Sequence, residues 1–367
     1  MRQQLPGNQR AIFAVVEKDA IFLAGDGATD DGDRPFLDRL ALADGTRTPA
    51  RSRPTPRSSS SASRREQRIV AREQSQTEPP NLVLRDGDSR TVLTQWPDPS
   101  PQLRGVVRTL LRYSRRDGVA LSGTLWLPPG APPASGWPLL VWAYPLEYND
   151  KDTAGQVRAS PNRYLRVSGT SALALLAAGY AVLDDASMPV VGDPETMNDT
   201  LLQQLQWSAE AAIDAAVAHG IDRERVAIGG HSYGAFMTAN LLAHTQLFKA
   251  GIARSGAYNR TLTPFGYQSE RRTLWEAPQT YVEVSPLVHA DRIDEPLLLV
   301  HGELDDNPGT FPLQSQRLFQ AIRGNGGVAR LLVLPREAHG YAAQENVLHL
   351  LAEEIAWLDT HVRRAAR

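Results

Sequence analysis

From Arg104 onward, the sequence predicts an α/β fold in which a mainly parallel sheet is covered by helices on both faces. Short apolar runs that are typical of buried strands alternate there with longer runs whose apolar residues recur at helical spacing. Helix boundary signals support this pattern: residues 200–219 follow Asn198-Asp199 and stop at Gly220. Parallel neighbouring strands need crossover connections, which are usually helices, so the alternation indicates one sheet whose strands are connected by helices.

These signals assign the elements in chain order. A hairpin comes first, because Asp117-Gly118 separates two apolar runs and favours a tight turn. The predicted strands cover residues 106–113, 119–127, 138–144, 180–183, 226–229, 296–301 and 329–334. The predicted helices cover residues 171–178, 200–219, 235–244, 313–322 and 345–362.

The first 103 residues differ from this pattern. They contain short strand-like runs separated by turn signals such as Asp44-Gly45. Residues 46–68 are rich in Arg, Ser and Pro, so they can bury little apolar area and are predicted to be disordered. The sequence therefore predicts two domains, residues 1–103 and residues 104–367.

Composition narrows the classes of function. The formal net charge of −2 gives no basic field for nucleic acid, and no apolar run reaches the roughly 18 residues of a membrane span. Cysteine is absent, which excludes disulfides, thiolate zinc sites and a cysteine nucleophile. No histidine pair has convincing metal-ligand spacing, so no metal is predicted. Residues 1–20 make a poor signal peptide, and the default expectation is a cytoplasmic protein.

One pentapeptide indicates nucleophilic catalysis. Gly230-His231-Ser232-Tyr233-Gly234 matches the G-x-S-x-G elbow, with a strand-like run before it and a helical run after it. A serine hydroxyl is a weak nucleophile that must stand exposed beside a base, and a sharp strand-to-helix turn achieves this. The alternative is an ordinary serine in a glycine-rich turn. In its context the motif predicts an α/β-hydrolase fold with Ser232 as nucleophile.

The acid and the base are expected in loops after late strands, in the order Ser, acid, His. Asp305 follows the strand at 296–301 and is the predicted acid, with Asp306 and Glu303 as rivals. His339 follows the strand at 329–334 and is the predicted base.

Two donors are expected to stabilise the tetrahedral oxyanion. The backbone N–H of Tyr233, the residue after the nucleophile, is one of them. Tyr144 ends an early strand, and its hydroxyl can supply the other; a core aromatic is the competing interpretation.

Several motifs together carry a family resemblance. They are Val-Trp-Ala-Tyr-Pro at 141–145, Asp-Asp-Ala-Ser-Met-Pro at 184–189, the elbow with its flanks at 229–237, Ala-Arg-Ser-Gly-Ala-Tyr-Asn-Arg at 253–260, Ser-Glu-Arg at 269–271, His-Gly-Glu-Leu-Asp-Asp at 301–306 and His-Gly-Tyr at 339–341. Residues 104–362 resemble the catalytic domain of the prolyl oligopeptidase family of serine peptidases, most closely its glutamyl endopeptidase-like branch. The resemblance implies that Asp305 is the acid, that Tyr144 is the second oxyanion donor, and that the substrates are short peptides.

The resemblance also implies an N-terminal β-propeller over the active site. Residues 21–45 and 78–93 look like pieces of its last blades, so the chain resembles a member with a truncated propeller.

Glutamate preference would require a cation in the primary pocket. The candidates are Arg254, Arg260 and Arg271, with Arg272 as a further possibility and surface roles as the alternative. The sequence thus predicts a serine peptidase that needs no cofactor and acts on peptides. The alternatives are a carboxylesterase and an inactive remnant, and no oligomeric state is indicated.

Overall fold

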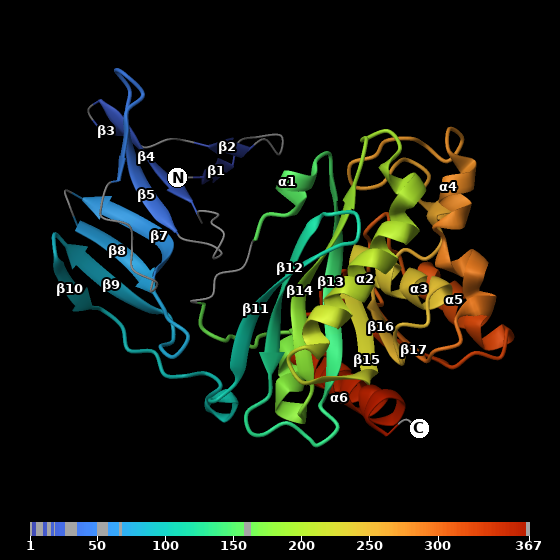
Figure 1. Ribbon diagram of the computed structural model, residues 1–367. Helices are drawn as coiled ribbons and strands as arrows, with labels where there is room; N and C mark the ends of the chain where they lie inside the picture. Colours follow the sequence, from blue (N-terminus) through green and yellow to red (C-terminus); the bar gives the residue numbers. More distant parts are fainter. Residues whose placement is uncertain are drawn as a thin grey trace. The chain divides into compact units, whose positions relative to one another are not determined.

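The computed structural model describes residues 2–4, 10–12, 16–17, 19–25, 35–49, 58–65, 68–157 and 163–364. The chain divides into two compact units (Figure 1). The first comprises Met1–Pro101 with Val157–Arg166, and the second comprises Gln102–Gln156 with Val167–Arg367.

In the described residues of the first unit, all strand pairs are antiparallel. Two of them have four strands each, in the orders β3-β4-β5-β6 and β10-β9-β8-β7, and strands β1 and β2 form a separate pair. Four antiparallel strands are the number that a propeller blade has. The strands are β1 (Arg2–Gln4), β2 (Arg10–Ile12), β3 (Val16–Glu17), β4 (Ala20–Gly25), β5 (Phe36–Ala41), β6 (Arg47–Pro49), β7 (Ser58–Arg65), β8 (Arg68–Glu73), β9 (Asn81–Asp86) and β10 (Ser89–Val92).

Part of the segment predicted to be disordered is paired as strand. Strand β6 pairs with β5, and strand β7 pairs with β8. Antiparallel pairing uses backbone groups, so a neighbouring apolar strand can hold a polar segment that would not fold alone. Residues 50–57 and 66–67, which the same prediction covers, lie outside the described residues.

The second unit is built on one eight-stranded sheet in the order β11-β12-β14-β13-β15-β16-β17-β18. Strand β12 pairs antiparallel with both neighbours, whereas all pairs from β14 to β18 are parallel. The predicted hairpin is confirmed, and Gly118 in its turn has a φ of 86° that favours glycine. The strands are β11 (Val107–Ser114), β12 (Ala120–Leu127), β13 (Trp137–Tyr148), β14 (Ala181–Val191), β15 (Ile221–His231), β16 (Ala250–Arg254), β17 (Leu297–Gly302) and β18 (Ala329–Leu334).

Helices cover both faces of this sheet. Helices α2 and α3 contact each other on one face, whereas α6 packs with the 3₁₀ helix η2 (Figure 1). Alternate β13 residues point to opposite faces, and both Leu139 and Leu140 are fully buried, so neither face is open there. The α-helices are α1 (Lys151–Ala154), α2 (Leu201–Val217), α3 (Tyr233–His244), α4 (Pro278–Glu283), α5 (Leu313–Gly324) and α6 (Gln344–Leu358). The shorter helical segments are η1 (Pro101–Leu103), η2 (Ala172–Ala178), η3 (Met197–Thr200), η4 (Arg260–Leu262), η5 (Pro286–Arg292) and η6 (Asp359–Arg363).

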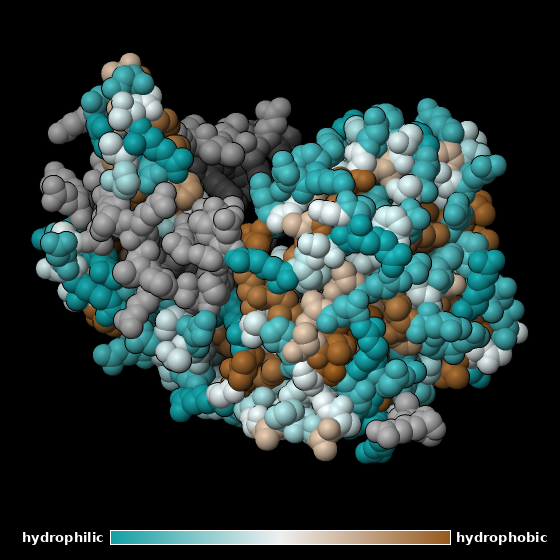
Figure 2. Space-filling model, viewed as in Figure 1, coloured by the Kyte–Doolittle hydropathy of each residue, from teal (hydrophilic) through white to brown (hydrophobic). Residues whose placement is uncertain are grey.

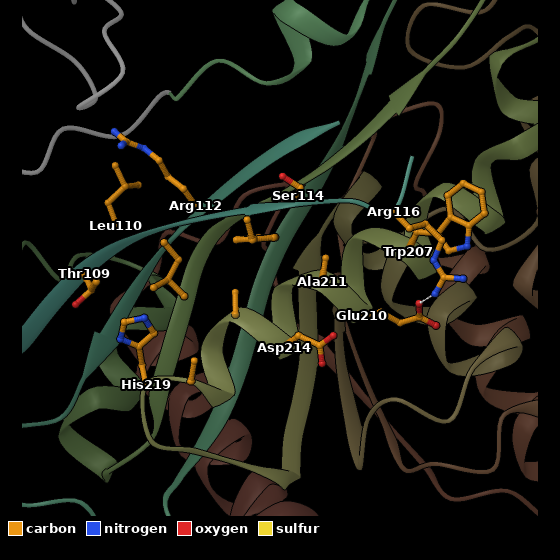
Figure 3. A pocket seen from close by; sticks show the side chains of 14 residues that line it. Thr109, Leu110, Arg112, Ser114, Arg116, Trp207, Glu210, Ala211, Asp214 and His219 are labelled. Carbon is orange, nitrogen blue, oxygen red and sulfur yellow. Dashed lines mark hydrogen bonds and ion pairs between the residues drawn. The ribbon is translucent and has the colours of Figure 1, made fainter. Parts of the chain in front are cut away.

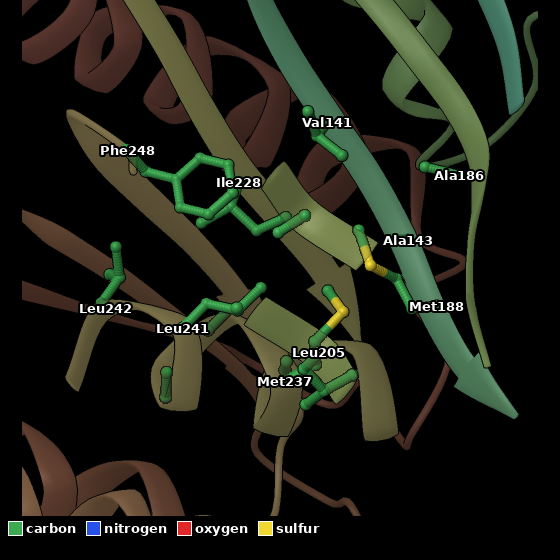
Figure 4. Close-up of a cluster of buried hydrophobic side chains, with 14 of the residues drawn as sticks. Val141, Ala143, Ala186, Met188, Leu205, Ile228, Met237, Leu241, Leu242 and Phe248 are labelled. Atoms are coloured by element: carbon green, nitrogen blue, oxygen red, sulfur yellow. The ribbon is translucent and has the colours of Figure 1, made fainter. Parts of the chain in front are cut away.

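The main core lies between the sheet and helices α2 and α3. In Figure 4, Val141 and Ile228 of the sheet lie near Leu241 of α3 and Leu205 of α2, all within one buried cluster. Figure 2 shows that the visible outer face is mostly hydrophilic, with apolar residues gathered over the region of β11 and β12. The predicted α/β-hydrolase fold is confirmed, and antiparallel sheets precede it where the sequence predicts a partial β-propeller.

Within the described ranges, no helix combines the length and the apolar character that crossing a membrane requires.

Candidate active site

Ser232 stands at the turn between β15 and α3, as the elbow motif predicts. Its φ of 58° lies in the left-handed region, where a residue other than glycine is strained. The Ser232 backbone N–H donates to the Arg254 carbonyl at 2.8 Å, which ties the turn to strand β16. The turn therefore presents the side chain at the carboxyl end of the parallel strands.

The two glycines of the motif allow the elbow to approach β13. A Cβ atom added at Gly230 would lie 2.7 Å from the carbonyl oxygen of Ala143, and one added at Gly234 would meet the same oxygen still more closely. Neither position has space for a side chain, which is why the motif needs glycine on both sides of the serine.

The structure brings Asp305 and His339 together. The two residues follow β17 and β18, and His339 Nδ1 lies 2.9 Å from Asp305 Oδ2. A carboxylate only accepts, so Nδ1 carries the proton and Nε2 is left free to act as a base. The His339 ring lies 4.8 Å from the ring of His231, the residue before Ser232, so the base is next to the elbow.

Asp305 is favoured over its rivals by its surroundings. It is buried, whereas Asp306 and Glu303 are exposed. Burial alone would raise the pKa of Asp305, but the hydrogen bonds from His339 and from the Asn307 N–H hold that pKa below its ordinary value. The carboxyl group thus stays ionised beside the imidazole.

A second histidine, which the sequence does not indicate, contacts the same carboxylate. His301 Nε2 lies 3.1 Å from Asp305 Oδ2, and His301 Nδ1 lies 2.6 Å from Ser315 Oγ. The Thr310 hydroxyl reaches the same oxygen at 3.2 Å. The only sequence signal was the position of His301 at the end of β17, four residues before the acid.

Tyr144 lies at the surface and not in the core. It is 45% exposed, so the alternative of a core aromatic is wrong. Burial of the hydroxyl raises the pKa of Tyr144, and hydrogen bonds with Gln268 and with the Ser232 side chain oppose this rise. The Tyr144 ring lies 6.2 Å from the ring of Tyr233, the residue after Ser232, so the phenol is close to the elbow.

Tyr233 begins helix α3, where the first N–H groups have no partner within the helix. Its side chain is buried, and its hydroxyl donates to Glu147 Oε1 at 3.2 Å. Burial, then the Glu147 charge, raises the pKa of this phenol well above its ordinary value, so it stays protonated. The backbone N–H of Tyr233 is thus available to an oxyanion, whereas its side-chain hydroxyl is bonded to Glu147.

The three candidate arginines differ sharply. Arg254 is not placed to bind substrate, because its guanidinium forms two 2.6 Å hydrogen bonds with the buried carboxylate of Glu354 and a third with the Thr170 carbonyl. This correction follows from the packing of α6, which supplies Glu354. Arg271 is exposed, and Arg272 is paired with Asp199 and Glu270.

Arg260 is a buried cation without an ion-pair partner among the described residues. It is 7% exposed, its Nε makes no hydrogen bond, and its NH2 group donates to the Gly266 carbonyl at 2.8 Å. Its guanidinium lies over the Tyr267 ring at 4.8 Å and over the Phe236 ring at 5.8 Å. A buried guanidinium normally has a carboxylate partner, so the position favours an anionic ligand.

One hollow of the second unit is separate from this site. A hollow of about 580 Å³ lies between β11 and α2, with Arg112 and Trp207 among its lining residues, and no predicted site residue lines it (Figure 3). In the parts of the chain that the structure describes, no group of three or more His, Asp or Glu side chains could hold a metal ion.

Comparison with known proteins identifies the family. The model of the prolyl oligopeptidase family matches residues 200–365. A probable chloroplastic glutamyl endopeptidase of Arabidopsis thaliana is 46% identical over 360 residues, which are 93% of this chain and 38% of that protein. Residues 200–365 of the chain belong to the prolyl oligopeptidase family.

A second relative, a probable chloroplastic glutamyl endopeptidase of Oryza sativa subsp. japonica, is 44% identical over 94% of this chain and 39% of its own length. The chain thus spans less than two fifths of the length of these relatives. Their names place them in the chloroplast, and the cytoplasmic location of this chain stays a prediction.

Solved structures agree with the fold. Puromycin hydrolase superposes with a TM-score of 0.69 at 20% identity, over 93% of this chain and 52% of that one. Porphyromonas gingivalis dipeptidyl peptidase 4 gives 0.69 at 19% identity, over 93% and 48%.

Proposed function

We propose that this chain is a serine peptidase that hydrolyses peptide bonds through an acyl-enzyme intermediate. The hydrogen bond between His339 Nδ1 and Asp305 Oδ2, next to the strained turn at Ser232, carries the proposal. Membership of a peptidase family supports it. We also infer that residues 104–367 form the catalytic domain and residues 1–103 a separate one.

In the proposed mechanism, Ser232 Oγ attacks the scissile carbonyl carbon while His339 Nε2 takes the hydroxyl proton. The carbonyl oxygen becomes negative and receives hydrogen bonds from the Tyr144 hydroxyl and the Tyr233 backbone N–H. The C–N bond then breaks as His339 returns the proton to the leaving amine. Water, deprotonated by the same nitrogen, cleaves the acyl ester and restores Ser232, while Asp305 stabilises the imidazolium in both halves.

Labelling with a fluorophosphonate probe tests the nucleophile. We expect the folded protein to label and the Ser232→Ala variant to lose all labelling, because the probe reacts with an activated serine. Turnover of a peptide amide then separates peptidase from esterase. Hydrolysis of p-nitrophenyl esters without any amide turnover would favour a carboxylesterase, and folded protein that does not label would be inactive.

We further propose that the enzyme prefers glutamate on the acyl side of the cleaved bond and that Arg260 binds its carboxylate. Arg260 supports this assignment because its guanidinium is buried and its Nε makes no hydrogen bond. Its charge also lies close enough to Tyr233, the neighbour of the nucleophile, to lower the pKa of that phenol against the effect of burial. The preference itself is what the names of the two plant relatives indicate for those proteins.

Matched peptides with Glu, Gln or Ala before the scissile bond test the pocket. We expect Arg260→Met to lower kcat/KM for the Glu peptide about 10- to 100-fold, the value of a charged hydrogen bond, and to change the Gln peptide little. Arg271→Met is the matched variant and should keep the preference. If only Arg271→Met removes it, Arg260 is not the pocket cation; equal turnover of the three peptides by the wild type would exclude glutamate specificity.

A further inference from the structure

The loop of residues 266–270 is anchored to β13 beside Tyr144. Glu147, three residues after Tyr144, accepts hydrogen bonds from the backbone N–H groups of Gln268, Ser269 and Glu270. Glu147 is 9% exposed, so these bonds are largely shielded from water. These bonds therefore fix the position of the loop relative to strand β13, which carries Tyr144, the proposed oxyanion donor.

This anchor brings the Gln268 side chain to the Tyr144 hydroxyl. Gln268 Nε2 lies 3.2 Å from Tyr144 Oη and 3.3 Å from the carbonyl oxygen of Pro145. A carbonyl oxygen only accepts, so the atom that faces it must be the amide nitrogen and not the amide oxygen. The nitrogen has two hydrogens, one for each acceptor.

The direction of the bond to Tyr144 follows from this assignment. The amide donates, so the phenol oxygen accepts, and the phenol proton must point away from Gln268. That proton is then free to be donated on the side of Ser232, whose side chain lies near enough to influence the pKa of the phenol. Accepting one hydrogen bond polarises a hydroxyl and makes it a stronger donor in the next.

We propose that Gln268 is a positioning residue that orients and polarises the Tyr144 hydroxyl toward the oxyanion. The inference rests on the proposed function, in which Tyr144 is an oxyanion donor. Gln268 acts on the reacting oxygen only through Tyr144. Its contribution therefore belongs to the transition state, where the charge on that oxygen develops, and not to the binding of the ground-state carbonyl.

The assignment predicts a specific kinetic pattern. Gln268→Met keeps the length of the side chain but removes the donor, and we expect kcat to fall about 3- to 30-fold with KM nearly unchanged, less than the loss of a whole oxyanion donor. Gln268→Glu should cost more, because an ionised carboxylate only accepts and would draw the phenol proton toward itself. Gln279→Met, an exposed glutamine in α4, is the control and should turn over as the wild type does.

A double-mutant cycle with Tyr144→Phe decides between this role and a purely structural one. We expect Gln268→Met to have no further effect on kcat once the phenol is gone, since the glutamine works through that hydroxyl. An equal loss of kcat in both backgrounds would overturn the inference and assign Gln268 to loop structure. Fluorophosphonate labelling of Ser232 is measured on every variant. A wild-type protein that does not label overturns the proposed function itself. Normal labelling, together with effects of the two substitutions on kcat that simply add, overturns only the role of Gln268.

Discussion

Asp305 Oδ2 accepts hydrogen bonds from the imidazole rings of His339 and His301, and the bond from His301 holds the carboxylate in place. Asp305 can only accept, so His301 donates from Nε2 and its Nδ1 accepts from the Ser315 hydroxyl at 2.6 Å. Burial lowers the pKa of His301, which keeps this ring neutral and suits it for one donated and one accepted bond. The carboxylate that orients His339 is therefore itself held from behind.

We predict that this support matters for turnover. His301→Leu removes the donor and frees the carboxylate to rotate. We therefore expect kcat to fall about 10- to 100-fold, the usual effect of losing a residue that orients a functional side chain. His301→Gln offers an amide donor of similar reach and should recover most of the loss. Steady-state kinetics on both variants, with circular dichroism to establish folding, make the measurement. Folded His301→Leu protein with wild-type kcat would contradict the prediction.

At the same scale, the sequence located single residues better than their partners. The strand order and the elbow spacing placed Ser232, Asp305 and His339 in neighbouring loops, because each follows a recognisable strand. The sequence could not show that Arg254 pairs with Glu354, 100 residues further along, since that bond depends on how α6 packs. The link from Gln268 to Tyr144, 124 residues apart, was hidden for the same reason.

The elbow is an element whose geometry depends on close backbone approach. Strand β15, the turn and helix α3 press against β13 so tightly that Gly234 has no room for a Cβ beside the Ala143 carbonyl. Local signals predicted this element well, because a strand-like run, a tight motif and a helical run are contiguous in sequence. The segment at 46–68 was harder, since pairing with β5 and β8 decides its strands and composition does not.

Two helical glycines give a matched test of this packing. Gly234→Ala forces β13 and α3 apart and should lower the free energy of unfolding by about 1–3 kcal/mol, the usual cost of overpacking. Gly324, the last residue of α5, has nothing within 4 Å of an added Cβ, so Gly324→Ala should raise it by about 0.4–1 kcal/mol. Urea unfolding of both variants gives the comparison. Similar effects of the two substitutions would contradict the tight approach.

For the molecule as a whole, buried charges join distant parts of the second unit. The pair of Arg254 and Glu354 connects strand β16 to the last α-helix, with both side chains almost fully buried. Such a pair costs much of its attraction in desolvation, so it specifies the docking of α6 more than it stabilises the fold. Asp184, in contrast, has no compensating cation at hydrogen-bonding distance among the described residues.

Asp184 should make the stability of the protein depend on pH. Burial, reinforced by the neighbouring charge of Asp185, raises the pKa of Asp184 to about 7 from a value of 3.8 in an unfolded chain. Between these two values the folded protein binds more protons than the unfolded chain, so the free energy of unfolding must decrease as pH rises from about 4 to about 7. At pH 8 the half-buried aspartate carries a negative charge.

Asp184→Asn removes that charge and should abolish this decrease. We expect the variant to match the wild type near pH 4 and to exceed its free energy of unfolding by about 1–3 kcal/mol at pH 8, allowing for partial solvent access. Asp291→Asn, an exposed residue in η5, should leave the pH dependence as it is in the wild type. Urea unfolding at several pH values between 4 and 8 measures all three proteins. Curves for Asp184→Asn and the wild type that run parallel across this range would mean that folding does not raise the pKa of Asp184.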